Sequence, residues 1–256
     1  MKKQFIKSII ICMAIILFLP TIQVSAKEDH WYCKRNDQHK QPKMDSNFSY
    51  IEQYGGIYID SKRGDDCFDK VIYLTFDVGY ENGNVKKIVD VLNNENVKGS
   101  FFILGNIIDK EPELIKQMSN DGHLICNHTL NHPNLTKKSE DELIYEIKAL
   151  EDAYKNLTGK EMSKFFRPPE GTFNQEMLMR VQKLGYKTVF WSFAYADWDN
   201  DKQMSEAQAL KKILDNVHNG EIMLLHPTSQ TNASIMQALI RELKSCGYRF
   251  ATLDEL

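Results

Sequence analysis

The chain has 256 residues, of which 42% are hydrophobic and 26% are charged, so it has enough apolar material for one main folded domain. Its formal charge at pH 7 is −3. Because it has neither a basic stripe nor a basic tail, a nucleic acid partner is not expected.

The first 26 residues have the pattern of a secretory signal peptide. Three lysines within the first seven residues precede an uncharged apolar run over 9–19, and residues 24–26 offer a small-residue cleavage site. The run is short for a bilayer span, and an uncleaved membrane anchor is the alternative. We therefore expect an exported protein without stable membrane insertion after signal cleavage.

Four cysteines follow this segment. No two of them have the Cys-x-x-Cys spacing, so a zinc site built on cysteine is not expected. Cys33 and Cys67 both precede the predicted core and form the candidate pair for a disulfide bond. Cys126 lies in an apolar strand pattern, which favours packing as a small hydrophobe. The sequence leaves the connectivity open.

The predicted elements begin after a polar stretch. Residues 27–50 show no periodicity, so we expect a lead-in segment over 27–68 rather than a domain. Apolar runs typical of buried strands then alternate with runs at helical spacing. Strands are predicted over 71–76, 100–104, 123–126, 164–166, 187–193, 222–225 and 248–252. Helices are expected around 85–92, 114–122, 139–159, 167–185, 205–220 and 234–245. Two of these helices begin with capping boxes, at Ser139 and Ser205.

Seven strands that alternate with helices indicate an α/β fold with a parallel sheet. This number of units favours a closed, distorted (β/α) barrel over an open doubly wound sheet. In both folds the C-terminal ends of the strands lie on one face, and that face carries the active site. Polar residues that follow strand ends are therefore expected to converge at one mouth.

Five polar side chains follow the ends of predicted strands: Asp77, His128, Arg167, Asp197 and His226. Each one taken alone has an ordinary structural alternative, such as a loop carboxylate, a surface arginine or a buried histidine. The Pro-Pro pair after the arginine stiffens its segment, which suits a side chain held in place to orient a carboxylate. The coincidence of all five at strand ends favours a catalytic site.

A pair of histidines and several aromatic residues extend this set. His128 and His132 are four residues apart, a spacing that lets both imidazoles face one side of a helical turn. Neutral imidazole is a good ligand for zinc-like ions, and the alternative is a satisfied core pair. Trp191, Tyr195 and Trp198 either belong to the core or stack on sugar rings at the barrel mouth.

Five motifs, in order, resemble those of the polysaccharide deacetylase family (NodB homology, carbohydrate esterase family 4). They are Thr75-Phe76-Asp77-Val78-Gly79, His128-Thr129-Leu130-Asn131-His132, Arg167-Pro168-Pro169-Glu170-Gly171, Asp197-Trp198 and Leu224-Leu225-His226. The resemblance covers about 69–253, and the family has a second aspartate where this chain has Val78. The following Tyr80-Glu81-Asn82-Gly83 is similar to the branch from spore-forming bacteria that deacetylates N-acetylmuramic acid of peptidoglycan, toward muramic δ-lactam of the spore cortex.

The resemblance implies a distorted (β/α) barrel and the hydrolytic removal of acetyl from an N-acetylated amino sugar. It implies that His128 and His132 hold one divalent metal ion, with Zn²⁺ favoured. By the same resemblance, Asp77 is the general base and Arg167 supports its charge. The leaving amine is protonated by His226.

The remaining implied roles are those of Asp197, which orients the acid, and of four substrate-binding residues: Tyr80, Trp191, Trp198 and Leu225. The expected partner is a peptidoglycan glycan strand, bound by a monomer in the cell wall or in the intermembrane space of the forming spore. Since Val78 is unable to ligate, we expect weak metal binding. Two alternatives remain open: a deacetylase of N-acetylglucosamine or another polysaccharide, and a non-catalytic protein that binds cell-wall glycan.

Overall fold

The computed structural model describes residues 27–35 and 38–256, so the predicted signal peptide lies outside the described residues. Its centre is a curled sheet of seven strands in which every pairing is parallel. The order is β7 (Lys187–Thr188), β5 (Phe165–Phe166), β4 (Leu124–Asn127), β3 (Ser100–Ile103), β2 (Val71–Val78) and β8 (Glu221–Leu225), with β9 (Arg249–Ala251) paired to β2. The predicted parallel sheet of about seven strands in an α/β fold is thereby confirmed.

The long central strand β2 organises the barrel. One of its edges pairs with β8, whereas its other edge is shared between β9 at the start and β3 at the end. The strand expected over 187–193 is shorter, because regular pairing stops at Thr188. Beyond it the chain makes single parallel bridges, from Val189 to Ile57 and from Phe193 to Met223. The second bridge brings the chain after β7 alongside β8, so the sheet curls into an incomplete barrel.

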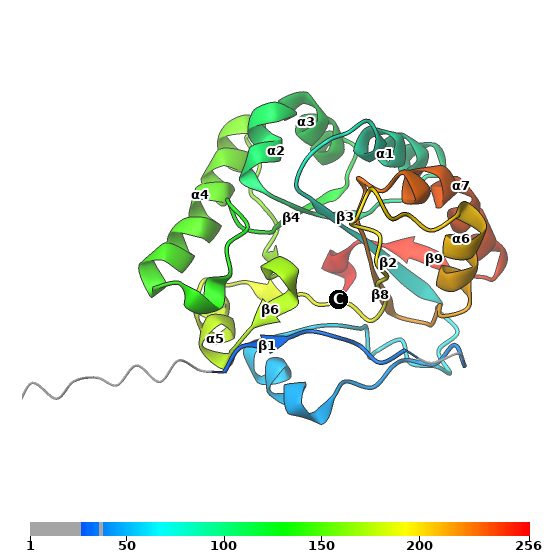
Figure 1. The fold of residues 1–256 in the computed structure, drawn as a ribbon, viewed down its shortest axis with the longest axis horizontal. Coiled ribbons are helices and arrows are strands. Elements are labelled where there is room, and N and C mark those ends of the chain that lie inside the picture. Colours follow the sequence, from blue (N-terminus) through cyan, green and yellow to red (C-terminus); the bar gives the residue numbers. More distant parts are fainter. Residues whose placement is uncertain (1–26, 36–37) are drawn as a thin grey trace, which may run out of the picture.

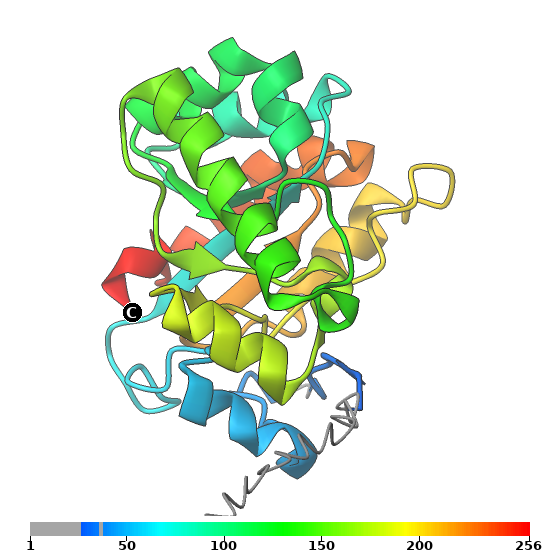
Figure 2. The ribbon, with the colours of Figure 1, turned by 90° about the vertical axis from the view of Figure 1, so that its left-hand side faces the viewer.

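Helices cover the outside of this sheet (Figures 1 and 2). They are α1 (Asn84–Asn94), α2 (Gly105–Lys110), α3 (Pro112–Asn120), α4 (Glu140–Thr158), α5 (Gln175–Lys183), α6 (Glu206–Leu214) and α7 (Gln230–Ser245). The capping boxes predicted at Ser139 and Ser205 are present, at the starts of α4 and α6. The sequence did not predict α2, because six residues are too few for a helical period to emerge. Within the described part of the chain, none of the helices is long and apolar enough to cross a membrane.

The alternation of side chains along β2 divides the interior into two layers. Ile72, Leu74, Phe76 and Val78 belong to the apolar cluster that packs under the outer helices. Val71 and Tyr73 belong instead to the smaller cluster with Phe102 of β3 and Ile222 of β8. Because successive side chains of a strand point to opposite faces, Thr75 and Asp77 continue the row of Tyr73.

The segment before the sheet runs along one side of the molecule (Figure 1), where Ile57 bridges to Val189 after β7 and Ile59 bridges to Glu221 of β8. It contains β1 (Asp29–His30), which pairs antiparallel with β6 (Thr172–Phe173), and the 3₁₀ helix η1 (Ser46–Tyr54). Trp31, Phe48 and Ile51 are buried in a cluster that includes residues of α5. A short 3₁₀ helix flanked by irregular backbone has no helical or strand period, which is why the sequence shows none here.

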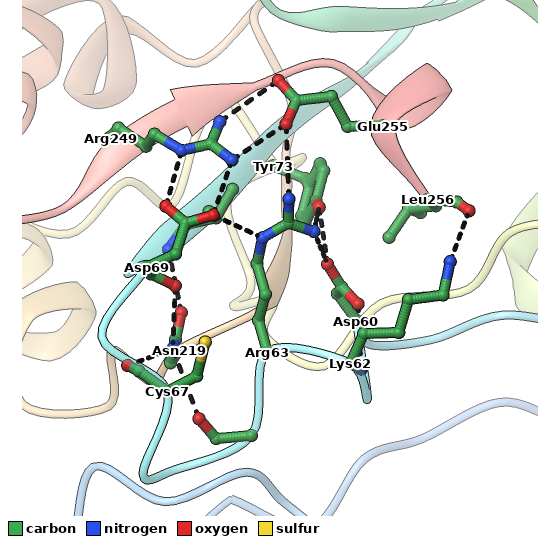
Figure 3. Close-up of polar contacts among 12 residues, drawn as sticks. Asp60, Lys62, Arg63, Cys67, Asp69, Tyr73, Asn219, Arg249, Glu255 and Leu256 are labelled. Atoms are coloured by element: carbon green, nitrogen blue, oxygen red, sulfur yellow. Dashed lines mark hydrogen bonds and ion pairs between the residues drawn. The ribbon is translucent and has the colours of Figure 1, made fainter.

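A charged network ties this segment to the C-terminal end of the chain (Figure 3). Arg63 forms ion pairs with Asp60 and Asp69, and Arg249 of β9 bridges Asp69 and Glu255. Asp60 also accepts a hydrogen bond from the Tyr73 hydroxyl, at 2.7 Å. The network joins 60–69, β2 and β9 at the end of the barrel where β2 begins.

The four described cysteines are free thiols, so the bridge expected between Cys33 and Cys67 is not formed. Cys33 packs against the apolar cluster of the N-terminal segment, and burial raises the pKa of its thiol to about 12. Cys67 lies instead in the turn that follows Gly64, where its carbonyl accepts from Asn219. Cys126 is fully buried in the small cluster inside the sheet.

Candidate active site

A pocket of about 730 Å³ opens where the strands β2, β4 and β8 end. Its walls include seven of the residues that the sequence singled out: Asp77, Tyr80, His128, His132, Trp191, Trp198 and His226. Arg167 and Asp197 lie behind the wall, where they contact Asp77 and His226. Residues separated by up to 149 positions in the chain thus share one cavity (77 to 226).

The carboxylate of Asp77 is held by a buried arginine. Nη1 of Arg167 donates to Asp77 Oδ1 at 2.8 Å, and the guanidinium has no exposed surface. Burial by itself would raise the pKa of Asp77, but the positive charge of Arg167 and the imidazolium of His226 outweigh it and lower the pKa. Asp77 is therefore an anion at neutral pH and able to accept a proton.

Arg167 itself is fixed by neutral acceptors. Nη2 donates to Thr75 Oγ1 at 2.9 Å and to the Phe190 carbonyl at 3.3 Å, and Nε donates to the Val189 carbonyl at 3.2 Å. The guanidinium also lies over the Phe102 ring, 4.1 Å from its centroid. These contacts leave the cation one orientation, with Nη1 toward Asp77.

His226 and Asp197 form the second charged pair of the site. Nδ1 of His226 donates to Asp197 Oδ1 at 2.7 Å, and the backbone N–H of His226 donates to Oδ2 at 2.8 Å. Burial opposes the charged imidazolium, but the hydrogen bond and charge of Asp197, together with the charge of Asp77, raise the pKa of His226. Since Asp197 occupies Nδ1, Nε2 is the nitrogen available for proton transfer in the pocket.

The histidines 128 and 132 lie side by side, with ring centroids 5.0 Å apart. Nδ1 of His128 donates to the Arg167 carbonyl at 2.8 Å, which leaves Nε2 as an unprotonated acceptor, 3.6 Å from Asp77 Oδ2. Burial lowers the pKa of His128 to about 4, so the ring is neutral. A neutral imidazole whose other nitrogen donates to a backbone carbonyl is the usual arrangement of a metal-ligating histidine.

The turn that carries these histidines has a strained backbone, which hydrogen bonds to neighbouring side chains hold in place. Thr129 and His132 have left-handed φ values of 74° and 59°. Glu146 of α4 accepts from both the backbone N–H and the side-chain amide of Asn131, at 2.8 and 2.9 Å. Asn127 Oδ1 accepts from Thr129 N–H at 2.9 Å. Strain of this kind persists only where the surroundings over-determine the conformation.

Two residues face away from the pocket. Val78 is fully buried among the apolar side chains under the outer helices, on the face of β2 opposite to Asp77. Leu225, expected to bind substrate, lies in the same apolar cluster, while its neighbour Leu224 lines the pocket. Both placements follow from the two-residue alternation of a strand.

The pocket has aromatic walls at different depths. Trp191 packs against Gly171, where a Cβ atom would lie 2.7 Å from the indole ring; this glycine also has a φ of 65°. Tyr80 and Trp198 are half-exposed and largely exposed at the rim, and the Tyr80 hydroxyl accepts from Asn200 at 2.7 Å. The Trp198 ring lies edge-on to His226, with centroids 6.0 Å apart. Exposed rings beside a catalytic pocket suit the stacking of sugars.

Some residues that build the site were not predicted. Thr75 and Glu146 support the arginine and the histidine turn, and Asn232 of α7 contacts both Asp197 and His226. Thr75 and Asn232 lie in a predicted strand and next to a predicted helix. The only sign of their roles in the sequence was a polar residue at a position expected to be buried. In the described ranges, no group of three or more histidine, cysteine or acidic side chains is arranged to hold a metal ion.

Comparisons with known proteins show the family to which the chain belongs. A family model described as polysaccharide deacetylase matches residues 65–189. The chain is 38% identical to the peptidoglycan-N-acetylmuramic acid deacetylase PdaA of Bacillus subtilis, over 96% of this chain and 94% of that protein. The solved structure of PdaA, a family 4 carbohydrate esterase, superposes with a TM-score of 0.84 and covers 90% of this chain and 97% of that one. A peptidoglycan-N-acetylglucosamine deacetylase of Bacillus cereus is 34% identical over 82% of this chain and 74% of its own length.

The chain therefore belongs to the polysaccharide deacetylase family, carbohydrate esterase family 4. It is accordingly a hydrolase of amide-linked acetyl groups, and its incomplete parallel barrel is the fold of that family.

Proposed function

We propose that this protein removes acetyl from N-acetylmuramic acid in peptidoglycan, on the route to muramic δ-lactam of the spore cortex. The observation that carries the proposal is the arrangement of two charged pairs, Asp77–Arg167 and His226–Asp197, around one pocket. The 38% identity to PdaA over nearly the whole chain supports the choice of sugar. The protein would act after export, as a monomer on glycan strands in the cell wall or in the intermembrane space of the forming spore.

The chemistry follows from the two pairs. Asp77, held ionised by Arg167, takes the proton of the water that attacks the acetamide carbonyl. As the tetrahedral intermediate collapses, the C–N bond breaks and Nε2 of His226 gives its proton to the departing amine. Asp197 keeps the imidazole oriented and favours its charged form. Acetate and a free amino sugar are the products.

His128 and His132 are the residues that would hold a divalent ion, with zinc favoured. The donor set fits in part: His128 lines the pocket, and its unprotonated Nε2 and carbonyl-bonded Nδ1 suit a ligand. Bound there, a divalent ion supplies polarisation of the acetamide carbonyl and acidification of the attacking water. Val78 offers no third ligand and points into the core.

We predict that the protein binds this ion weakly. Val78 supplies neither a third ligand nor a negative charge, and the nearby carboxylate of Asp77 is already neutralised by its ion pair with Arg167. Dialysis against a chelator should leave protein without zinc, and activity should return when zinc is added. Atomic absorption on the dialysed protein checks this. One zinc retained per chain through chelation would contradict the prediction.

The two alternatives differ from this proposal either in the sugar that is deacetylated or in the absence of catalytic activity. A deacetylase of N-acetylglucosamine or another polysaccharide is supported by the 34% identity to the Bacillus cereus enzyme. A non-catalytic wall-binding protein would be supported only by Val78, while the intact Asp77, Arg167 and His226 argue against it. The division into a lead-in segment over 27–68 and a catalytic domain over 69–253 remains part of the proposal.

Two measurements test these functions. Purified protein should release acetate from isolated peptidoglycan when zinc is present; absence of release with every divalent ion tried would favour the non-catalytic alternative. Mass spectrometry of muropeptides from a strain that lacks the protein should show loss of muramic δ-lactam. Unchanged δ-lactam together with increased N-acetylation of glucosamine would replace the proposed sugar with N-acetylglucosamine.

A further inference from the structure

Asn232 is a fully buried asparagine in the first turn of α7, and its side chain joins both members of the acid pair. Its Nδ2 donates to Asp197 Oδ2 at 2.6 Å and to the His226 carbonyl at 3.1 Å. Its Oδ1 accepts from the Tyr195 hydroxyl. Asn232 itself takes no part in the proton transfers of Asp77 and His226.

The partners of Asn232 allow only one orientation of its amide. The Asp197 carboxylate and the His226 carbonyl are both acceptors, so the NH₂ group must face them. The Tyr195 hydroxyl then donates to the remaining oxygen. The backbone N–H of Asn232 is fixed as well, because it donates to Ser229 Oγ, the cap of α7, at 3.1 Å. The side chain is therefore anchored to a rigid helix end.

This anchoring determines how Asp197 meets the imidazole. Oδ2 of Asp197 already accepts from Asn232 and from the His226 backbone N–H, at 2.6 and 2.8 Å. Oδ1 is left to accept from His226 Nδ1 at 2.7 Å. With both oxygens committed, the carboxylate is unable to rotate away from the ring. The bond from Asn232 to the His226 carbonyl holds the backbone of the same histidine.

We propose that Asn232 is a positioning residue for the general acid, which locks the Asp197 carboxylate and the His226 backbone to each other. The inference rests on the proposed role of His226 as the acid. Four groups face the imidazole: Asp197, Asp77 and Arg167 by charge, and the ring of Trp198 by contact. Of these, Asp197 alone among the described residues makes a hydrogen bond to the ring, so its orientation controls the acid.

Asn232→Leu tests the proposal in zinc-supplemented protein, with acetate release as the assay. Leucine has the same branched heavy-atom skeleton, somewhat larger in volume, but offers no donor and leaves little room for a bridging water. We expect kcat to fall about 10- to 100-fold, less than complete loss of a general acid, with KM changed by less than about two-fold. The basic limb of the pH profile should also move to lower pH. The reason is that a loosened Asp197 supports the imidazolium less, so the raised pKa of His226 returns toward its ordinary value.

A spectroscopic measurement gives an answer that does not depend on turnover. The proton on His226 Nδ1, shared with the Asp197 carboxylate, should give a downfield ¹H NMR signal, assigned by its absence in His226→Gln. In Asn232→Leu this signal should shift upfield or vanish through exchange with water. Because the measurement needs no substrate, it separates this proposal from the proposed function. A wild-type protein without deacetylase activity overturns the proposed function, and the NMR signal still decides the role of Asn232.

Two further variants complete the design. Tyr195→Phe removes only the hydroxyl that orients the Asn232 amide. It should therefore change kcat and the NMR signal in the same direction as Asn232→Leu, but by a smaller factor. If Asn232→Leu fails to fold, Tyr195→Phe takes its place in the test. Asn219→Ala is the matched control, since Asn219 is a buried asparagine before β8 that donates to three backbone carbonyls far from the pocket. It should lower the melting temperature without shifting the basic limb. An unchanged NMR signal in both Asn232→Leu and Tyr195→Phe, or an equal shift of the limb in Asn219→Ala, overturns the proposal.

Discussion

Asp77→Asn is expected to abolish acetate release while the protein stays folded. The substitution keeps the shape and an oxygen that still accepts from Arg167, but an amide does not take a proton from water. Loss of the general base costs about 10²- to 10⁴-fold in kcat. Arg167 loses its counter-charge, a change that costs at most about 3–5 kcal/mol in a buried pair. The guanidinium keeps its bonds to Thr75, Val189 and Phe190, so we expect the lower part of that range.

The matched control for this variant is Asp60→Asn. Asp60 is also a buried carboxylate paired with an arginine, Arg63 (Figure 3), but it lies near the start of β2 and does not line the pocket. The two variants should lose similar amounts of thermal stability, as measured by calorimetry, whereas only Asp77→Asn should lose turnover. Full activity in Asp77→Asn would remove Asp77 as the base. Equal loss of activity in Asp60→Asn would show that the effect is one of folding.

His226→Gln should lower kcat by about 10²- to 10⁴-fold and remove the basic limb of the pH profile. In the wild type the acid must carry a proton, and the raised pKa of His226 keeps the imidazolium populated to a higher pH than in an unperturbed histidine. Activity should therefore fall as the pH rises through this raised pKa. Glutamine does not titrate, so the residual activity of the variant should show no such fall. Steady-state rates measured from about pH 5 to about pH 10 check both expectations, because this range includes the ordinary pKa of histidine.

His218→Gln is the control for this variant. His218 is a buried histidine whose Nε2 bonds Ser192 Oγ at 2.8 Å, away from the pocket lining. Its burial lowers the pKa to about 4, so it is neutral at the pH of the assay. The variant should keep the basic limb of the wild type. A basic limb that survives in His226→Gln would mean that another group supplies the proton.

Most of the regular fold could be predicted because its strands are buried on both faces. All seven predicted strands occur in the sheet, and the two capping boxes start helices where expected. The segment from Asp29 to Tyr54 was not resolved into elements, since a two-residue strand and a 3₁₀ helix produce no period. The end of β7 was placed too late, because a β-branched and aromatic run continues after regular pairing has stopped.

The residues of the site also fall into those that the sequence located and those that it did not. Most of the charged groups could be located because Asp77 lies at the end of β2 and Arg167 and His226 directly follow β5 and β8, and parallel strands bring those ends together. Asp197 lies in the irregular chain beyond β7. The supporting groups were not predictable from position: Glu146 comes from the middle of α4 and Asn232 from the start of α7. Their partners lie 15 and 35 residues away along the chain, and no local pattern reports such a contact.

The sequence by itself determined the order of elements, the family and the chemical groups available to the site. Only the tertiary structure decided which neighbours face the cavity: Asp77 rather than Val78, and Leu224 rather than Leu225. The physical reason is that the side chains of a strand alternate between its two faces with a period of two residues. The phase of this alternation, meaning which set of residues faces the cavity, depends on which face of the sheet the outer helices cover. Shifting that phase by one residue would place Val78 at the pocket and bury the base in the core.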